Sequence, residues 1–203
     1  MTSSGARGVT RVADAALGLT ALGWVARDLW SARAFTLVGA TLAGVNLVVG
    51  LLFLLRRRAE RMAPMLDSAL CLASVPVSAV LLALAPPPEL WPWAGRGVFL
   101  GGAIVAVGSL LMLGRSFGVL PAIRGLVQAG PYRLVRHPIY LGELGMVLGG
   151  ALAVRSAAGW AVAALGLGLV VVRIHIEERL LATTEPYRAY RARVRFRLVP
   201  GLW

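Results

Sequence analysis

The sequence predicts an all-α integral membrane protein, built as a bundle of about six transmembrane helices. Hydrophobic residues make up 58% of its 203 residues and charged residues only 15%, and the mean hydropathy is +0.76. Average proteins carry about 25% charged residues, so a chain this apolar is expected in lipid. The charged residues also fall between apolar runs whose lengths are close to the thickness of a bilayer.

Six apolar segments of spanning or nearly spanning length are expected, at about 12–30, 34–55, 66–85, 97–114, 138–154 and 157–176. Charges shorten the first one, so five spans with an interfacial first helix remain an alternative. Pro76 lies inside the third segment and is expected to kink it. Two glycine pairs have the spacing that lets membrane helices approach closely, namely Gly97 with Gly101 and Gly145 with Gly149.

The arginines predict the topology. The chain has no lysine, so its net charge of +12 comes from 21 arginines, and 17 of these lie in the N-terminus, in 55–65, in 115–137 and from 173 onward. The other four are Arg27, Arg33, Arg96 and Arg155. The positive-inside rule therefore places both termini in the cytoplasm. Basic residues that alternate with apolar runs do not form a nucleic-acid face, so nucleic acid is not expected as a partner.

The whole chain, 1–203, is expected to form a single membrane domain, with N-terminal helices over 1–114 and a catalytic region over 115–203. Polar residues gather in the catalytic region, in three runs at 130–142, 173–181 and 187–190. Both histidines of the protein belong to these runs. Because the 115–137 loop and the segment from 173 onward are predicted to be cytoplasmic, the chemistry is expected on the cytoplasmic face.

Pro138 is well suited to the first position of a helix, where its missing N–H group is not needed. The preceding residues Arg133, Arg136 and His137 would then surround a helix N-terminus, which attracts carboxylates and phosphates. This pattern predicts an anion site at the membrane surface. An alternative is that the same residues cap a loop at headgroup level and contact lipid phosphates.

Arg173 and Glu177 are four residues apart and share a helical face, while Glu178 and His175 point elsewhere. Ionisable residues at membrane depth are expected to bind a ligand or to be paired. The alternative is that the helix has already reached water there. His137, His175 and Glu177 lack the close spacing of a metal site, so no metal is predicted.

The runs GPYRLVRHPIYLG at 130–142, Glu177-Glu178 and YRAYRARVRFRLVPG at 187–201 resemble the isoprenylcysteine carboxyl methyltransferase family, which is related to membrane phospholipid N-methyltransferases. The resemblance covers about 115–203. It implies a cytoplasmic pocket for S-adenosylmethionine, made by the last helices and their loops. It also implies methyl transfer to a lipophilic acceptor that enters from the bilayer, either the carboxylate of an isoprenylcysteine-like molecule or another lipid group.

The resemblance also implies roles for individual residues. Arg173 matches the substrate-binding arginine of the family. The cofactor-binding residues would be Gly125, Leu126, Val127, Tyr132, His137, Pro138, Ile139, Tyr140 and Glu177.

The chemistry of methyl transfer suggests catalytic residues. Transfer from a sulfonium is an in-line displacement, for which a protein supplies alignment, desolvation and charge placement. A carboxylate acceptor needs no base, and Arg173 could orient it through two contacts. An amine or thiol acceptor needs a base, for which Glu178, His175 and Glu143 are candidates. Arg173 and Glu178 are the predicted catalytic residues.

Two other functions remain as alternatives. Membrane sterol and steroid reductases, which use NADPH, resemble the same region, but their element commonly reads His-Pro-Asn-Tyr, whereas Ile139 stands here in the third place. The second alternative is a transporter or a non-catalytic membrane protein. The absence of lysine and the abundance of Ala, Gly, Leu and Arg suggest a bacterial source, so we expect the bacterial inner membrane as the location and do not expect prenylated proteins as substrates.

Overall fold

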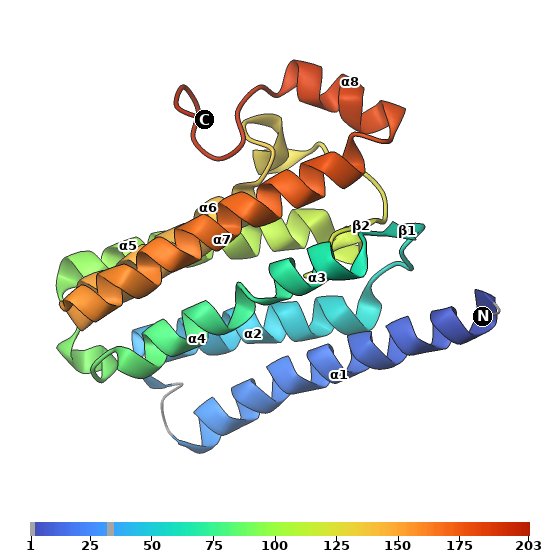
Figure 1. The fold of residues 1–203 in the computed structure, drawn as a ribbon. Coiled ribbons are helices and arrows are strands. Elements are labelled where there is room, and N and C mark those ends of the chain that lie inside the picture. The colour runs from blue at the N-terminus through green and yellow to red at the C-terminus, as the bar shows by residue number, and fades with distance from the viewer. Residues whose placement is uncertain (1–2, 32–34) are drawn as a thin grey trace.

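The computed structural model describes residues 3–31 and 35–203, which form an almost entirely helical bundle (Figure 1). Within these residues there are eight α-helices: α1 (Ser3–Trp30), α2 (Leu37–Leu55), α3 (Met65–Leu72), α4 (Val75–Leu84), α5 (Trp93–Leu113), α6 (Pro138–Val154), α7 (Ala157–Leu181) and α8 (Glu185–Arg193). Three 3₁₀ turns and two short strands complete it: η2 (Pro88–Leu90), η3 (Gly114–Ser116), η4 (Gly130–Arg133), β1 (Arg61–Met62) and β2 (Ala122–Ile123).

Among the described residues, three helices are long and apolar enough to cross a bilayer: α2, α5 with the turn that follows it, and α7. The fourth apolar helix, α6, is shorter. The protein is therefore a helical integral membrane protein with three candidate spans. Helices lie at all six predicted segments, and α6 has the predicted bounds. The predicted start of the second segment at 34 and the outer Arg33 lie outside the described residues.

The third apolar segment is divided rather than bent. Helix α3 ends at Leu72 and α4 begins at Val75. Pro76 is at the start of α4, where a residue without an N–H group cannot continue the hydrogen bonds of the preceding helix. Ser74 is buried in the break, and its hydroxyl donates to the Cys71 carbonyl over 2.8 Å. The predicted interruption at Pro76 is confirmed. The break places the polar side chain of Ser74 inside an apolar layer.

Helices α5 and α6 pack through glycines. A Cβ atom on Gly142 would lie 2.4 Å from a main-chain nitrogen of α5, and one on Gly102 would lie 2.6 Å from the Gly142 carbonyl oxygen. Both distances are too short for any side chain. This close contact fixes α6 against α5 and so fixes the polar residues at the start of α6.

The predicted glycine pairs have different outcomes. On α6, Gly145 and Gly149 face α5 at contact distance, as predicted. On α5, Gly97 and Gly101 face open space, so the prediction for this pair was wrong. The i, i+4 spacing identifies glycines that share a helix face, but the spacing does not say which face meets the neighbouring helix.

Three segments close over one end of the bundle, where Figure 1 shows β1, β2 and the N-terminus. The strands pair antiparallel, with Arg61 opposite Ile123 and Met62 opposite Ala122. At the start of α6, the N–H groups of Arg136 and His137 donate over 2.9 Å to the Phe196 and Arg197 carbonyls of the C-terminal tail, residues 194–203. The loop after α5, the connection after α2 and the tail are thereby held together over the ends of α6 and α7.

Candidate active site

A cavity lies where the loop after α5 passes over the ends of α6 and α7. The empty space of this cavity, together with the open solvent at its mouth, amounts to about 670 Å³. Its walls come from the 113–127 loop, from the start of α6, from α7 and from α8. Seven of the nine predicted cofactor-binding residues line it: Gly125, Leu126, Val127, Tyr132, His137, Tyr140 and Glu177.

Helix α6 begins at Pro138 with His137 as its N-cap, as predicted. Pro138 itself is fully buried, and Ile139 packs on the apolar cluster around Phe53 and Phe117. Neither residue lines the cavity. Because Pro138 sets the helix start, its contribution to the site is to fix the direction of His137 and Tyr140.

Glu178 lies at the centre of a buried ionic cluster. Its carboxylate accepts from Arg136 Nε at 2.7 Å and from Arg197 Nε at 3.0 Å, and its Oε1 lies 3.2 Å from His137 Nε2. We call these four residues, Arg136, His137, Glu178 and Arg197, the clasp. Arg136 also donates through Nη1 to the carbonyls of Val194 and Arg195. The clasp therefore joins the tail to α6 and α7.

The clasp bears on two predictions. The Arg136 guanidinium was expected to attract an external anion, but its Nε and Nη1 atoms are bound by protein groups. Glu178 was predicted to be catalytic, yet it does not line the cavity, and its side chain is 6% exposed. A carboxylate with three basic partners is a weak proton acceptor, so the geometry favours a positioning role for Glu178.

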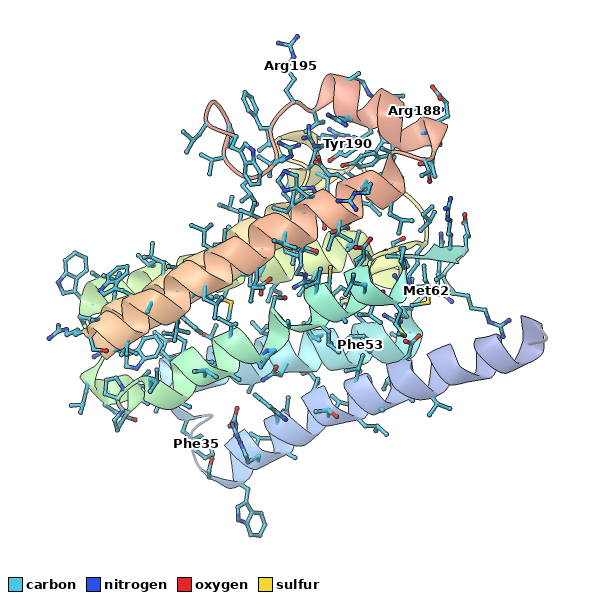
Figure 2. The ribbon with its side chains drawn as sticks, viewed as in Figure 1. Phe35, Phe53, Met62, Arg188, Tyr190 and Arg195 are labelled. Carbon is cyan, nitrogen blue, oxygen red and sulfur yellow. The ribbon has the colours of Figure 1, made fainter. Side chains whose placement is uncertain are left out.

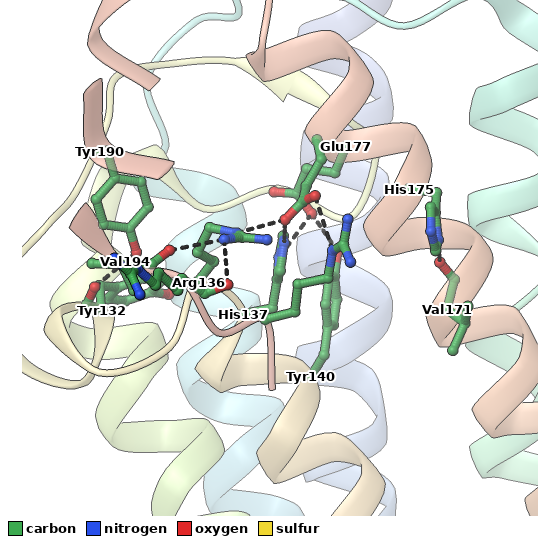
Figure 3. Close-up of polar contacts among 12 residues, drawn as sticks. Tyr132, Arg136, His137, Tyr140, Val171, His175, Glu177, Tyr190 and Val194 are labelled. Carbon is green, nitrogen blue, oxygen red and sulfur yellow. Dashed lines mark hydrogen bonds and ion pairs between the residues drawn. The ribbon is translucent and has the colours of Figure 1, made fainter. Parts of the chain in front are cut away.

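Glu177 faces the cavity. Its side chain is 32% exposed, its Oε2 accepts from the Tyr140 hydroxyl over 2.7 Å, and the same oxygen lies 4.0 Å from His137 Nδ1. The His137 and Tyr140 rings are stacked, with centroids 5.6 Å apart (Figure 3). The stacked rings hold the Glu177 carboxylate at the cavity wall and leave part of it free to meet a ligand.

Arg173 lies directly behind the cavity wall. Its guanidinium donates to Ser74 Oγ over 3.0 Å and to the Val119 carbonyl over 3.2 Å, and it stacks 4.8 Å from the centre of the Tyr140 ring. Glu143 Oε2 lies 3.8 Å from Arg173 Nη1. The Arg173 side chain is 8% exposed and does not line the cavity, although Val119 and Tyr140 do. Only a layer of contacting residues separates it from the cavity.

His175 lies apart from these residues. It is exposed on the opposite face of α7, where its Nδ1 lies 2.7 Å from the Val171 carbonyl, and Figure 3 shows it well away from the clasp. Its geometry does not support the role of base that was considered for it. Within the described residues, no group of three or more His, Cys, Asp or Glu side chains could hold a metal ion.

Tyrosines close the cavity from the side of α8. Tyr190 lies beneath α8, while Arg188 and Arg195 point outward (Figure 2). The Tyr190 hydroxyl donates to the Tyr132 carbonyl over 2.7 Å, and the Tyr132 hydroxyl donates to Ser109 on α5. Burial raises the pKa of Tyr190 to about 12, so its proton stays available for this hydrogen bond.

Sequence reasoning missed Arg124 and the cavity-lining role of the α8 tyrosines. Tyr187 and Tyr190 are three residues apart on a short helix and face the cavity together. This i, i+3 spacing was a usable signal. No local pattern distinguished Arg124 from the other arginines of its loop, because its burial depends on how the loop folds over α2.

The comparisons with known proteins agree with the location of the cavity. Residues 91–188 match the family model described as phospholipid methyltransferase, and the comparison with curated proteins gives no match. The matched stretch contains α5, α6, α7, the start of α8 and the whole loop that lines the cavity. This part of the chain is an S-adenosylmethionine-dependent methyltransferase domain that acts on a lipid-type acceptor. The reductase and non-catalytic interpretations are set aside.

Proposed function

We propose that this membrane methyltransferase binds S-adenosylmethionine in the cavity between the 113–127 loop, α6, α7 and α8, and that its acceptor is a lipophilic carboxylate of the isoprenylcysteine type. The main support is that Gly125, Leu126, Val127, Tyr132, His137, Tyr140 and Glu177 line one cavity although they come from separate parts of the chain. The N-terminal helices complete a single membrane domain around this site.

The cavity has the groups that the cofactor requires. Glu177 offers a partly exposed carboxylate for an ammonium group or for ribose hydroxyls. Gly125 has a φ of 116°, which side chains rarely adopt, and its backbone can therefore approach a ligand closely. Tyr132 and Tyr140 supply aromatic walls. A carboxylate, bare backbone and aromatic faces together suit a molecule that combines an amino acid with a nucleoside.

When bound, S-adenosylmethionine supplies an electrophilic methyl group on a sulfonium. The residues of the chain align the acceptor with it and exclude water. Arg173 is the candidate for orienting an acceptor carboxylate, since a guanidinium can bind both carboxylate oxygens. It would exchange its contacts with Ser74 and the Val119 carbonyl for the acceptor. A carboxylate acceptor needs no base, whereas an amine acceptor would make Glu143, which is 27% exposed, the candidate.

The proposed topology has six spans with α3 and α4 as one broken span, and both termini in the cytoplasm. The arginine distribution supports it, as does the common location of the N-terminus, β1 and β2 at one end of the bundle. The site then faces the cytoplasm, where S-adenosylmethionine is made. The lysine-free composition supports a bacterial inner membrane as the location.

Calorimetric titration of the detergent-purified protein tests the cofactor assignment. We expect saturable binding of S-adenosylmethionine and S-adenosylhomocysteine, and no binding of NADPH. Turnover with N-acetyl-S-farnesylcysteine and with phosphatidylethanolamine tests the acceptor. Methylation of the first alone supports the carboxylate assignment, while methylation of the second alone overturns it.

A further inference from the structure

Two arginine side chains line the cavity, and they differ in how their guanidinium groups are used. Arg136 belongs to the clasp, where its Nε donates to Glu178, and its Nη1 donates to the carbonyls of Val194 and Arg195. Arg124 is only 6% exposed, and its Nη1 donates a long hydrogen bond to the Leu120 carbonyl at 3.4 Å. Among the described residues, its buried Nε atom has no hydrogen-bond partner.

A second buried arginine stands directly behind Arg124. The Arg56 side chain, at the end of α2, is 5% exposed and pairs with Asp14 of α1. Its Nε and Nη1 atoms also have no hydrogen-bond partner within the described residues. The Nη1 atoms of Arg56 and Arg124 both lie within 3.2 Å of the position that a Cβ atom of Gly118 would occupy. The glycine leaves the space into which the two groups converge.

This arrangement concentrates positive charge beside the cavity. Burial, and after it repulsion from Arg124, lowers the pKa of Arg56 to about 10. Burial likewise lowers the pKa of Arg124, and the carboxylate of Glu177 raises it. Glu177 is also engaged by the Tyr140 hydroxyl. Buried charges with unpaired N–H groups are costly, and an anion that enters the cavity would offset that cost.

We propose that Arg124, with Arg56 behind it, forms an anion subsite that binds a carboxylate or phosphate group of a ligand in the methyltransferase cavity. This inference rests on the proposed function and deepens it. Two ligands would carry such a group: S-adenosylmethionine has a carboxylate, and the proposed lipophilic acceptor has one as well. The subsite is separate from the clasp and from Arg173, and Gly118 and Arg124 bring it to the cavity wall.

The test compares Arg124→Gln with wild type, using S-adenosylmethionine and its decarboxylated analogue, which differ only in the carboxylate. If the subsite binds the cofactor, the variant loses about tenfold or more in affinity for S-adenosylmethionine. Its affinity for the decarboxylated analogue then stays within about twofold of wild type. Arg58→Gln, which changes an exposed arginine of the same end of the bundle, is the matched control and is expected to leave both affinities unchanged.

The second arm measures the KM for N-acetyl-S-farnesylcysteine and for phosphatidylethanolamine at saturating cofactor. If the subsite binds the acceptor, Arg124→Gln leaves both cofactor affinities unchanged and raises the KM of the accepted lipid about tenfold. Unchanged cofactor affinities together with an unchanged KM overturn the subsite. Failure of the wild type to bind S-adenosylmethionine would instead overturn the proposed function, so the two failures are distinguishable.

Stability separates a binding role from a structural one. Removing one of two repelling buried charges should not lower the melting temperature of the ligand-free protein, so Arg124→Gln is expected to melt at or above the wild-type temperature. Gly118→Ala provides a second variant, because the new Cβ would lie 2.4 Å from Arg124 Nη1 and displace the guanidinium. It is expected to reproduce the selective loss of affinity. A large fall in the melting temperature of Arg124→Gln would assign the arginine to the fold and overturn the proposal.

Discussion

Glu177 and Glu178 are neighbours on α7, yet their carboxylates lie in two different regions of the molecule. Glu177 lies in the cavity wall, is a third exposed and accepts one hydrogen bond from Tyr140. Glu178 lies in the clasp, where Arg136, His137 and Arg197 surround it. A helix turns by about 100° per residue, so adjacent side chains point to different neighbours.

The difference indicates that two acidic residues of one motif serve different purposes. The cavity residue keeps free surface and can exchange its partner for a ligand. The Glu178 carboxylate already has Arg136 and His137 at the start of α6 and Arg197 of the C-terminal tail as its partners. Substitutions in the clasp should therefore lower stability, and substitutions in the cavity wall should lower binding or turnover at nearly constant stability.

The largest effect is expected for Glu178→Gln. This substitution keeps the shape of the side chain but leaves the buried Arg136 and the partly exposed Arg197 without their carboxylate. Breaking a buried pair such as Arg136 and Glu178 costs about 3–5 kcal/mol. We expect a strongly lowered melting temperature and faster amide exchange over 194–203, since the clasp holds the tail. Hydrogen exchange followed by mass spectrometry locates the change.

Glu185→Gln is the matched control for the clasp. Glu185 is an exposed acid of α8 that pairs with Arg188. Exposed pairs contribute about 0–1 kcal/mol, so this variant should melt close to the wild-type temperature. If Glu178→Gln were as stable as this control, the clasp would not hold the tail.

Glu177→Gln should show the opposite pattern. The amide cannot provide a charged acceptor for the cofactor, and loss of a charge-assisted hydrogen bond is worth about 1.5–3 kcal/mol, or about tenfold to a hundredfold in affinity. The melting temperature without ligand should change little. Calorimetric titration with S-adenosylmethionine measures the loss, and unchanged affinity would remove Glu177 from the cofactor site.

Arg173→Lys tests the layer behind the cavity wall. A lysine keeps the charge but cannot bind both oxygens of a carboxylate, so turnover should fall about tenfold while cofactor affinity is spared. Methyl transfer at saturating cofactor, compared with the titrated affinity, makes this distinction. Wild-type turnover in this variant would assign Arg173 to its contacts with Ser74 and Glu143.

Much of the fold could be predicted because hydropathy reports directly on burial in lipid. All six apolar segments contain helices, and the start at Pro138 is the predicted one. The charges near Glu177 made α7 look shorter than it is, because the helix continues after its apolar part to Leu181. The orientation of Gly97 and Gly101 was not predictable, since it depends on which neighbour α5 meets.

The site could be predicted in part. Motif residues such as Tyr132 and Glu177 come together because the loop, α6 and α7 meet at one end of the bundle. The burial and contacts of Glu178 and Arg124 could not be inferred from local spacing. Each depends on a partner far away in the sequence: Arg197 lies in the tail, and Arg56 lies at the end of α2.

The smallest effect is expected where the two regions meet, at Tyr190. Its hydroxyl donates to the Tyr132 carbonyl, and Tyr132 in turn lines the cavity next to the clasp. Tyr190→Phe keeps the packing of the ring and leaves that carbonyl without its partner, which costs about 1 kcal/mol. We expect a modest fall in melting temperature together with a few-fold loss of cofactor affinity. A fall in the melting temperature alone would assign the hydrogen bond to the stability of the fold, and a fall in cofactor affinity alone would assign it to the cavity. A fall in both would show that this hydrogen bond of α8 couples the cavity to the stability of the fold.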